Sequence, residues 1–399
     1  MIRNILIFVL FLGVLGSFAG GFYIGKIYGY VAPIEGVTNL EDGKPGDVDF
    51  SLFWDAWRVI QEQYVGPEPL NYEAMVHGAV KGMVESLGDP YTTFLDPKDT
   101  KLFLEDLSGS FGGVGMEIGM RESRLQIIAP LEGTPAEKAG LRAGDNILRI
   151  GEQFTNDMTI DEAVSLIRGP EGSKVMLLVL RDGWDEPREF DIERATITIP
   201  SLEWEFVEGD IAYVRLFQFS EKANQDFQRA ANEILASSSQ KVIIDVRNNP
   251  GGFLQVAIDI AAWFVDRGDI VVIEDSGDKG EREEHKARGN AAFRDHDVVV
   301  LINEGSASAS EILAGALRDN NQVQLIGKKS FGKGSVQELE TLKDQSSLKV
   351  TIANWLTPLG NLITGKGLEP DVEVELSDED FEANRDPQLD KAIEVLKNL

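Results

Sequence analysis

The second half of the sequence restricts the fold most, because short apolar runs alternate there with amphipathic ones. The apolar runs predict strands at 211–216, 242–246 and 298–302, and the amphipathic runs predict helices at 222–235, 254–264 and 308–318. Buried strands that are each followed by a crossover helix are typical of an α/β layer with a largely parallel sheet. We therefore predict an α/β core over residues 191–376 and a C-terminal helix within 377–399.

The first half of the sequence shows a different pattern of apolar residues and glycines. Apolar residues recur at helical spacing in 52–64 and 72–87, and a third helix is expected from Asp96-Pro97 to Leu107, which together predict an N-terminal helical region over 50–104. Short alternating strands, broken by glycines, then run from about 109 to 192, with helical patches at 135–139 and 160–167. This pattern predicts a compact strand-rich domain over 105–190.

The N-terminus predicts a membrane segment. Residues 5–24 carry no charge, and roughly 20 apolar residues span a bilayer. We expect an uncleaved single-pass anchor within residues 1–30, followed by a Pro-, Gly- and acid-containing linker over 31–49. The alternative is a cleaved signal peptide, since Ser17-Phe18-Ala19 offers a small-x-small cleavage site. In both cases the rest of the chain would lie outside the cytoplasm, at the cell membrane in the anchored form.

Composition excludes several kinds of site. The formal net charge of -29 is spread along 399 residues, which makes nucleic acid an unsuitable partner. Without cysteine the chain can form neither disulfides nor thiolate metal sites, and it has no cysteine nucleophile. Its three histidines, His77, His285 and His296, stand away from the glycine-rich turns, so neither a Ser-His-Asp arrangement nor a histidine zinc site is expected. We predict no metal and no cofactor.

The segment Gly305-Ser306-Ala307-Ser308-Ala309-Ser310-Glu311 precedes a predicted helix. Its small residues permit a sharp turn that would expose the Ser308 hydroxyl at the helix N-terminus, where backbone N–H groups stabilise developing negative charge. By itself, however, Ser308-x-x-Glu311 is better explained as a capping box that starts the helix. Ser308 is therefore a candidate nucleophile that needs further support.

A second candidate segment is Phe331-Gly332-Lys333-Gly334-Ser335-Val336-Gln337. In an extended strand Lys333 and Gln337 share a face, so the Gln337 amide could orient the lysine amine. As a base Lys333 would need a pKa lowered from ~10.4 to near neutrality, at a cost of roughly 4 kcal/mol that only burial can supply. A lysine between glycines is otherwise an exposed turn residue.

The third candidate is the turn Asp245-Val-Arg-Asn-Asn-Pro-Gly251-Gly252 after a buried strand. Glycine N–H groups can approach a substrate carbonyl closely, so Gly251, Gly252 and the N–H of Ala309 could form an oxyanion hole. A tight turn before a helix explains the same residues. No G-x-G-x-x-G follows a strand, which argues against dinucleotide binding.

Taken together, the chain from about Phe53 onward resembles the C-terminal processing peptidases of peptidase family S41, which are PDZ-bearing serine proteases with a Ser/Lys pair. The resemblance is carried by Gly133 to Asp145, by Ser110 to Gly115, by the Asp245–Gly252 turn, and by the places of Ser308 and Lys333. It implies a protease core of the ClpP/crotonase-like type with an inserted PDZ domain. It also implies an endopeptidase that cleaves exported proteins near an accessible apolar C-terminus.

The resemblance further assigns individual residues. It implies that Ser308 is the nucleophile, Lys333 the base and Gln337 the residue that positions it, with Gly251, Gly252 and Ala309 at the oxyanion. Supporting acidic positions fall on Asp245, Glu311 and Asp319, and the peptide-binding loop of the PDZ domain falls on Gly112, Gly113, Val114 and Gly115. Arg168 resembles an arginine through which a filled PDZ domain stabilises the active site. Dimerisation through the terminal helices is a further expectation.

Two alternatives stay open on the sequence. One is a non-catalytic scaffold whose PDZ domain binds C-termini, and the other is a crotonase-like acyl-CoA enzyme with the same core fold. The presence of Ser308, Lys333 and Gln337 argues against the first, and the predicted export and PDZ domain argue against the second.

Overall fold

The structure, a computed structural model, describes residues 48–399 except 122–123, 132, 157, 278–279, 281, 378, 381–382, 384 and the side chain of Asp161. The predicted anchor and most of the predicted linker lie outside the described residues. In the described part of the chain, no helix has both the length and the apolar character needed to cross a bilayer. The chain divides into two compact units, with the boundary between Val80 and Lys81.

The first unit is described from residue 48. It contains α2 (Ser51–Gln63) and the beginning of α3 (Tyr72–Glu85), close to the predicted helices. Trp57 is buried and stacks on Tyr72, with ring centroids 5.9 Å apart. Gln61 donates a hydrogen bond to the Tyr72 hydroxyl at 3.1 Å. These contacts fasten the two helices to each other.

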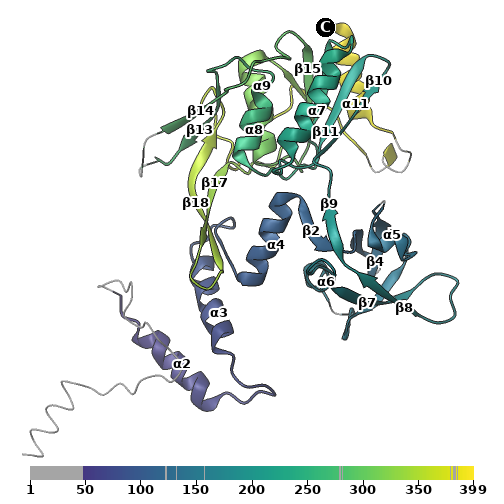
Figure 1. The fold of residues 1–399 in the computed structure, drawn as a ribbon. Coiled ribbons are helices and arrows are strands. Elements are labelled where there is room, and N and C mark those ends of the chain that lie inside the picture. Colours follow the sequence, from purple (N-terminus) through teal and green to yellow (C-terminus); the bar gives the residue numbers. More distant parts are fainter. Residues whose placement is uncertain are drawn as a thin grey trace, which may run out of the picture. The chain divides into compact units, whose positions relative to one another are not determined.

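The core of the second unit is a six-stranded sheet in the order β10-β11-β12-β15-β16-β19 (Figure 1). Its strands are β10 (Leu202–Val207), β11 (Ile211–Leu216), β12 (Lys241–Asp245), β15 (Asp297–Ile302), β16 (Gln324–Gly327) and β19 (Val372–Glu373). All neighbours are parallel except β10 and β11. The predicted largely parallel α/β layer is therefore present.

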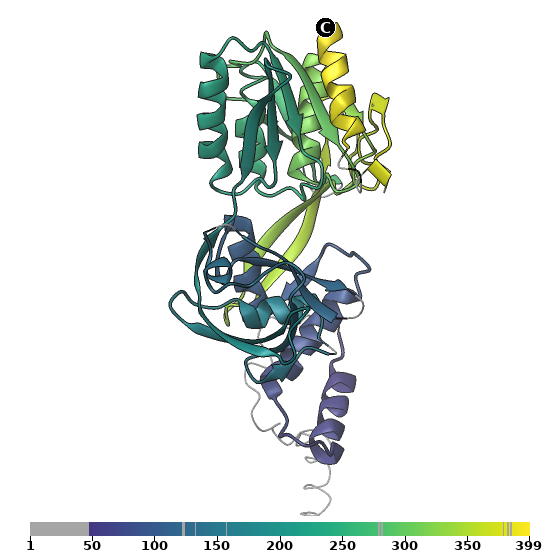
Figure 2. The ribbon, with the colours of Figure 1, turned by 90° about the vertical axis from the view of Figure 1, so that its right-hand side faces the viewer.

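Helices cover both faces of this sheet (Figure 2). On one face lie α7 (Ala223–Ala236), α8 (Leu254–Ala261) and α9 (Ala309–Asn321), packed against Val242 and Ile244 among others. On the other face α11 (Pro387–Asn398) places Ala392 and Leu396 against Ile243. Successive residues of β12 thus point to opposite layers, which explains why its sequence is apolar throughout.

A second, antiparallel sheet was not predicted. It has the order β1-β18-β13-β14, with β17 also paired to β18. Its strands are β1 (Thr93–Leu95), β13 (Ile270–Asp275), β14 (Arg282–Lys286), β17 (Ser335–Thr341) and β18 (Ser347–Leu356). Because β1 comes from the segment before the strand-rich domain, this sheet joins parts of the chain about 250 residues apart, such as Thr93 and Lys349.

The strand-rich domain follows α4 (Pro97–Ser108), whose N-cap Asp96 accepts a hydrogen bond from the N–H of Asp99. It has a six-stranded sheet and the helices α5 (Pro135–Lys138) and α6 (Ile160–Ile167). The strands are β3 (Met116–Arg121), β4 (Arg124–Pro130), β5 (Asn146–Ile150), β6 (Gln153–Phe154), β7 (Lys174–Leu180) and β8 (Arg188–Glu193). The entering strand β2 (Ser110–Gly113) pairs with the leaving strand β9 (Ala195–Thr198).

One buried ion network fastens the C-terminal helix to the central sheet. Arg247, just after β12, binds the carboxylates of Asp245 and Asp386 at 2.7 Å each. The Asp245 side chain is almost fully buried and also accepts from the Tyr213 hydroxyl. Asp386 is the N-cap of α11, so the network fixes where that helix begins.

We predict that Arg247→Met lowers the free energy of unfolding by about 3–5 kcal/mol, because it leaves the buried Asp245 carboxylate without its cation. Urea unfolding of the purified protein measures this. Arg229→Met is the matched control, since Arg229 forms an exposed ion pair with Asp226 and its loss should cost about 0–1 kcal/mol. Equal losses in the two variants would contradict the assignment.

Candidate active site

Ser308 stands at the junction of β15 and α9, where the strand-to-helix turn was predicted. Its backbone has φ 57° and ψ −115°, a conformation that residues with a side chain rarely adopt. Its neighbours Ala307 and Ala309 are buried, whereas Ser308 remains partly exposed. Although Ser308 and Glu311 are arranged as a capping box, the Ser308 side chain makes no cap hydrogen bond of ordinary geometry. The capping-box arrangement is therefore present, and the strained turn keeps Ser308 partly exposed at the start of α9.

The Gly251 turn lies directly against Ser308. A Cβ on Gly251 would come within 2.8 Å of the Ser308 Cβ and 3.0 Å of the Ala309 nitrogen, so only glycine fits here. Its φ of 102° also favours glycine. The N–H of Gly251 is already bound to the Asn249 side-chain oxygen at 2.9 Å. The structure thus gives Gly251 a steric role, and the contact of its N–H with the oxyanion stays a prediction.

Two other N–H groups remain available. Among the described residues, neither the N–H of Gly252 nor that of Ala309 has a hydrogen-bond partner. Gly252 is held by a parallel bridge to Phe219, and a Cβ on it would clash with the Phe219 carbonyl at 2.3 Å. A free N–H at the start of α9 and another in the adjacent turn are suitable donors for a developing oxyanion.

Glu311 links the two candidate catalytic segments. Its buried carboxylate accepts from the N–H of Ser308 at 2.9 Å and from the N–H of Lys333 at 3.0 Å. The N–H of Gly332 and the Ser330 hydroxyl complete four hydrogen bonds. Burial raises the pKa of Glu311, whereas the four donors oppose that rise. The carboxylate therefore sets the spacing of the Ser308 and Lys333 backbones.

Lys333 lies in the segment that leads into β17. Burial lowers the pKa of its ammonium group, while the negative charge of Glu311 acts in the opposite direction. Within the described part of the chain the Lys333 amine has neither an ion pair nor a hydrogen bond. It is partly buried, as the base hypothesis requires, and a lowered pKa increases the fraction of neutral amine near pH 7.

Sequence reasoning missed a second lysine near this site. Burial lowers the pKa of Lys349, in β18, and the positive charge of Lys333 lowers it further. The Lys349 ammonium also lies over the Phe103 ring, 5.4 Å from its centroid. Nothing in the local sequence marks Lys349, because its proximity to Lys333 depends on the unpredicted antiparallel sheet.

Gln337 does not bind Lys333 in this structure. Its amide nitrogen donates to the Tyr91 carbonyl at 2.7 Å. Tyr91 comes from the turn before β1, so this partner also depends on the antiparallel sheet. The positioning role expected for Gln337 stays a prediction.

Two supporting acidic residues lie elsewhere. Asp245 belongs to the Arg247 network described above, which faces α11. Asp319 accepts from the N–H of Leu359 at 3.0 Å, near the far end of α9 and about 16 Å along the helix from Ser308. Both are structural contacts, and of the three predicted acidic residues only Glu311 contacts the Ser308 and Lys333 segments.

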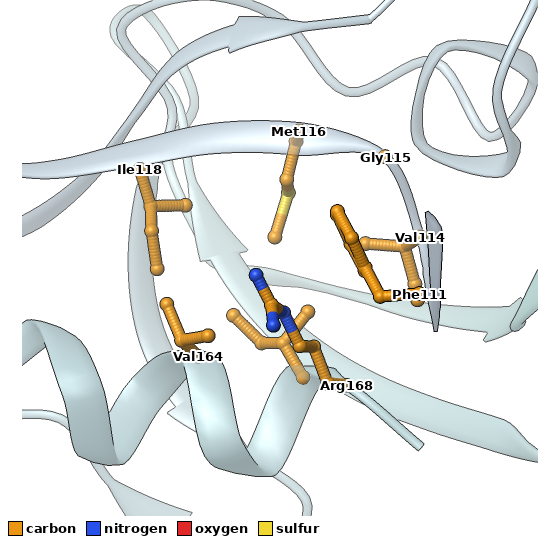
Figure 3. A pocket seen from close by; sticks show the side chains of 9 residues that line it. Phe111, Val114, Gly115, Met116, Ile118, Val164 and Arg168 are labelled. Atoms are coloured by element: carbon orange, nitrogen blue, oxygen red, sulfur yellow. The ribbon is translucent and has the colours of Figure 1, made fainter. Parts of the chain in front are cut away.

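The strand-rich domain carries a small apolar pocket (Figure 3). It is lined by Phe111, Gly113, Val114, Gly115, Met116, Ile118, Val164, Ile167 and Arg168. This set contains three of the four predicted loop residues and the predicted arginine. Gly112 is not among them; its carbonyl accepts a hydrogen bond from the Gly169 N–H at 3.0 Å.

Arg168 is the one charged residue among those that line the pocket. Its guanidinium lies 4.0 Å from the Phe111 ring centroid and binds the Asp106 carboxylate of α4 at 2.7 Å. Figure 3 shows the guanidinium between the pocket-lining side chains of Met116 and Val164. An apolar pocket with a cation and a glycine-rich loop can bind an apolar terminal residue together with its carboxylate.

Three family models match parts of the chain. Residues 210–374 match the model of peptidase family S41, and residues 126–181 match a PDZ domain. Residues 15–100 match the activating protease CtpB N-terminal domain.

Individual proteins give the same result. The carboxy-terminal processing protease CtpA of Bacillus subtilis (strain 168) is 35% identical over 343 residues, which cover 86% of this chain and 72% of that protein. The carboxy-terminal processing protease CtpB of the same strain is 37% identical over 328 residues, covering 81% and 67%. Among solved structures, the photosystem II D1 C-terminal processing protease is 30% identical with a TM-score of 0.52, covering 81% of this chain and 92% of that one.

We predict that Gly251→Ala reduces kcat at least about 100-fold, because the added methyl group displaces Ser308 and such misplacement is costly in catalysis. Steady-state cleavage of an unfolded protein measures it. Gly268→Ala is the control: its φ of 99° is nearly the same, but a Cβ there meets nothing within 4 Å. It should lose stability and keep kcat, and loss of kcat in both would indicate general damage.

Proposed function

The chain belongs to peptidase family S41 and is a carboxy-terminal processing serine protease with a PDZ domain, and from this premise we propose that Ser308 and Lys333 are its catalytic pair. The proposal rests on one observation: the Glu311 carboxylate accepts hydrogen bonds from the backbone N–H groups of both residues. The partly exposed hydroxyl and the partly buried, unpaired amine supply a nucleophile and a base.

The mechanism we propose is acyl transfer. Neutral Lys333 takes the proton of the Ser308 hydroxyl as its oxygen attacks the peptide carbonyl. The resulting oxyanion accepts hydrogen bonds from the N–H groups of Gly252 and Ala309. The Lys333 ammonium then gives its proton to the leaving amine, and the peptide bond breaks. Water, deprotonated by the same amine, then attacks the acyl-enzyme. The bond to the Ser308 oxygen breaks, and the Lys333 ammonium returns the proton to that oxygen.

Substrate selection is assigned to the PDZ domain. The pocket around Val114 and Met116 suits an apolar C-terminal side chain, and the Gly113-Val114-Gly115 loop with Arg168 suits its carboxylate. The substrates would be proteins with an accessible apolar C-terminus. A non-catalytic scaffold would bind the same C-termini. The relatives of this chain, however, are named as proteases. The backbone of Ser308 is also strained, as is common for a nucleophile in a sharp turn.

Other parts of the proposal rest on the sequence. The uncharged run 5–24 supports a single-pass anchor with the protease outside the cytoplasm, acting on exported proteins. A ClpP/crotonase-like core and dimerisation through the terminal helices remain proposals that follow from the family resemblance. An acyl-CoA function is disfavoured by the attached PDZ domain.

The central test compares Ser308→Ala and Lys333→Ala with the unchanged protein on an unfolded protein that ends in apolar residues. Removing the nucleophile should abolish cleavage, and removing the base should reduce kcat about 10²- to 10⁴-fold. Cleavage is followed by intact mass spectrometry of the products. Lys329→Ala is the control, because Lys329 is half-exposed and pairs with Glu369. Undiminished cleavage by Ser308→Ala would refute the proposed site.

Recognition of the C-terminus is tested with one peptide in two forms, with a free or an amidated terminal carboxyl group. Amidation should raise KM about 10- to 100-fold, because a charge-assisted hydrogen bond contributes roughly 1.5–3 kcal/mol. Arg168→Gln should reduce the difference between the two forms. An unchanged KM for the amidated peptide would show that the pocket does not bind the terminal carboxylate.

A further inference from the structure

The turn between α3 and β1 is built around one carboxylate. Asp89 accepts from the N–H of Tyr91 at 3.0 Å and from the Thr92 hydroxyl at 2.6 Å. An aspartate that binds the backbone two residues ahead closes an Asx turn, which fixes the direction of the following carbonyls. Thr92 is buried, and β1 begins directly after it.

This turn is attached to the hairpin of β17 and β18 at one cross-strand pair. Gln337 and Thr351 lie opposite each other in the two strands. The N–H of Thr351 donates to the Thr92 hydroxyl oxygen at 3.1 Å, and the Gln337 amide donates to the Tyr91 carbonyl at 2.7 Å. Both members of the pair are therefore held by neighbouring residues of the turn.

The Tyr91 carbonyl determines the orientation of the Gln337 amide. A backbone carbonyl can only accept, so the amide nitrogen must face Tyr91 and the amide oxygen must face away from it. Among the described residues nothing donates to that oxygen. Lys333 lies just before β17, and Gln337 lies four residues farther along the same segment with its amide oxygen unoccupied among the described residues. When one N–H of the Lys333 amine is held in a hydrogen bond to that oxygen, the direction of the nitrogen lone pair is restricted.

We propose that residues 89–92 are a positioning element for the base: Asp89 and Thr92 fix the turn, the Tyr91 carbonyl orients the Gln337 amide, and the Gln337 oxygen orients Lys333. The proposal rests on the catalytic pair proposed above and adds residues to it. These residues lie outside the segment 210–374 that matches the peptidase family and precede the PDZ domain. The protease half of the chain by itself thus lacks part of what aligns its base.

The variant that tests this is Thr92→Val, which keeps the shape of the side chain and removes both hydroxyl hydrogen bonds. Its kcat should fall about 10- to 100-fold, as for other misplaced catalytic groups, with KM for the apolar C-terminal substrate changed less than about twofold. Thr92→Ser keeps the hydroxyl and should restore kcat. Thr93→Val is the control. It removes the hydroxyl of the next residue, and that hydroxyl makes no hydrogen bond in the described structure, so kcat should be unchanged.

A second measurement separates positioning from loss of stability. Gln337→Glu cannot donate to the Tyr91 carbonyl, so it should also lower kcat. Because both changes break one connection, the double variant should lose little more than the more impaired single variant. If the losses of kcat multiply in the double variant, the positioning role is overturned and the catalytic pair stays intact. The same holds if kcat is unchanged in Thr92→Val while Ser308→Ala is inactive. Activity in Ser308→Ala would instead overturn the function on which the proposal rests.

Discussion

The hydrogen bonds to Glu311 are the interaction on which the rest of the site depends. Ser308 ends one turn and Lys333 begins another, 25 residues later, and in the described structure no hydrogen bond joins their side chains directly. The Glu311 carboxylate binds the backbone N–H of each. It also lies in the first turn of α9, where the helix dipole stabilises an anion. One buried carboxylate therefore fixes the distance between the nucleophile and the base.

This arrangement carries an electrostatic cost. A buried anion near Lys333 favours the protonated ammonium, which cannot act as a base. Two features limit the effect. Four donors spread the charge of Glu311, and burial of Lys333 acts on its pKa in the opposite direction and is the larger influence. The pKa of the neighbouring Lys349 is also lowered, by its burial and by the positive charge of Lys333.

Local sequence patterns predicted the parts of the fold that local forces determine. The helices α6 and α9 and the parallel strands β11, β12 and β15 were placed within a few residues, because their apolar periodicity records which face is buried. The antiparallel sheet was missed, since β1 and β18 are joined only by long-range pairing. No periodicity in either strand identifies the other as its partner.

In the candidate site, too, the features set by local sequence were predicted and those set by distant segments were not. The small residues around Ser308 predicted a sharp turn, and in the structure the glycine turn at 251–252 lies directly against it. The sequence could not show that the Gly251 N–H is occupied by Asn249, or that Gln337 binds the Tyr91 carbonyl. The family resemblance implied supporting roles for Asp245 and Asp319, and in the structure their carboxylates bind Arg247 and the Leu359 backbone. These partners are set by tertiary contacts between distant segments.

The most direct test of the account is the pH dependence of the rate at which a serine-reactive phosphonate labels Ser308. If Lys333 is the base, the rate should rise with pH along an acid limb whose midpoint lies below the ordinary lysine pKa of ~10.4, because only the neutral amine removes the hydroxyl proton. In Lys333→Met that limb should disappear and labelling should be slow at every pH. A rate that keeps the same pH profile in Lys333→Met, or a label found on another residue, would contradict the account.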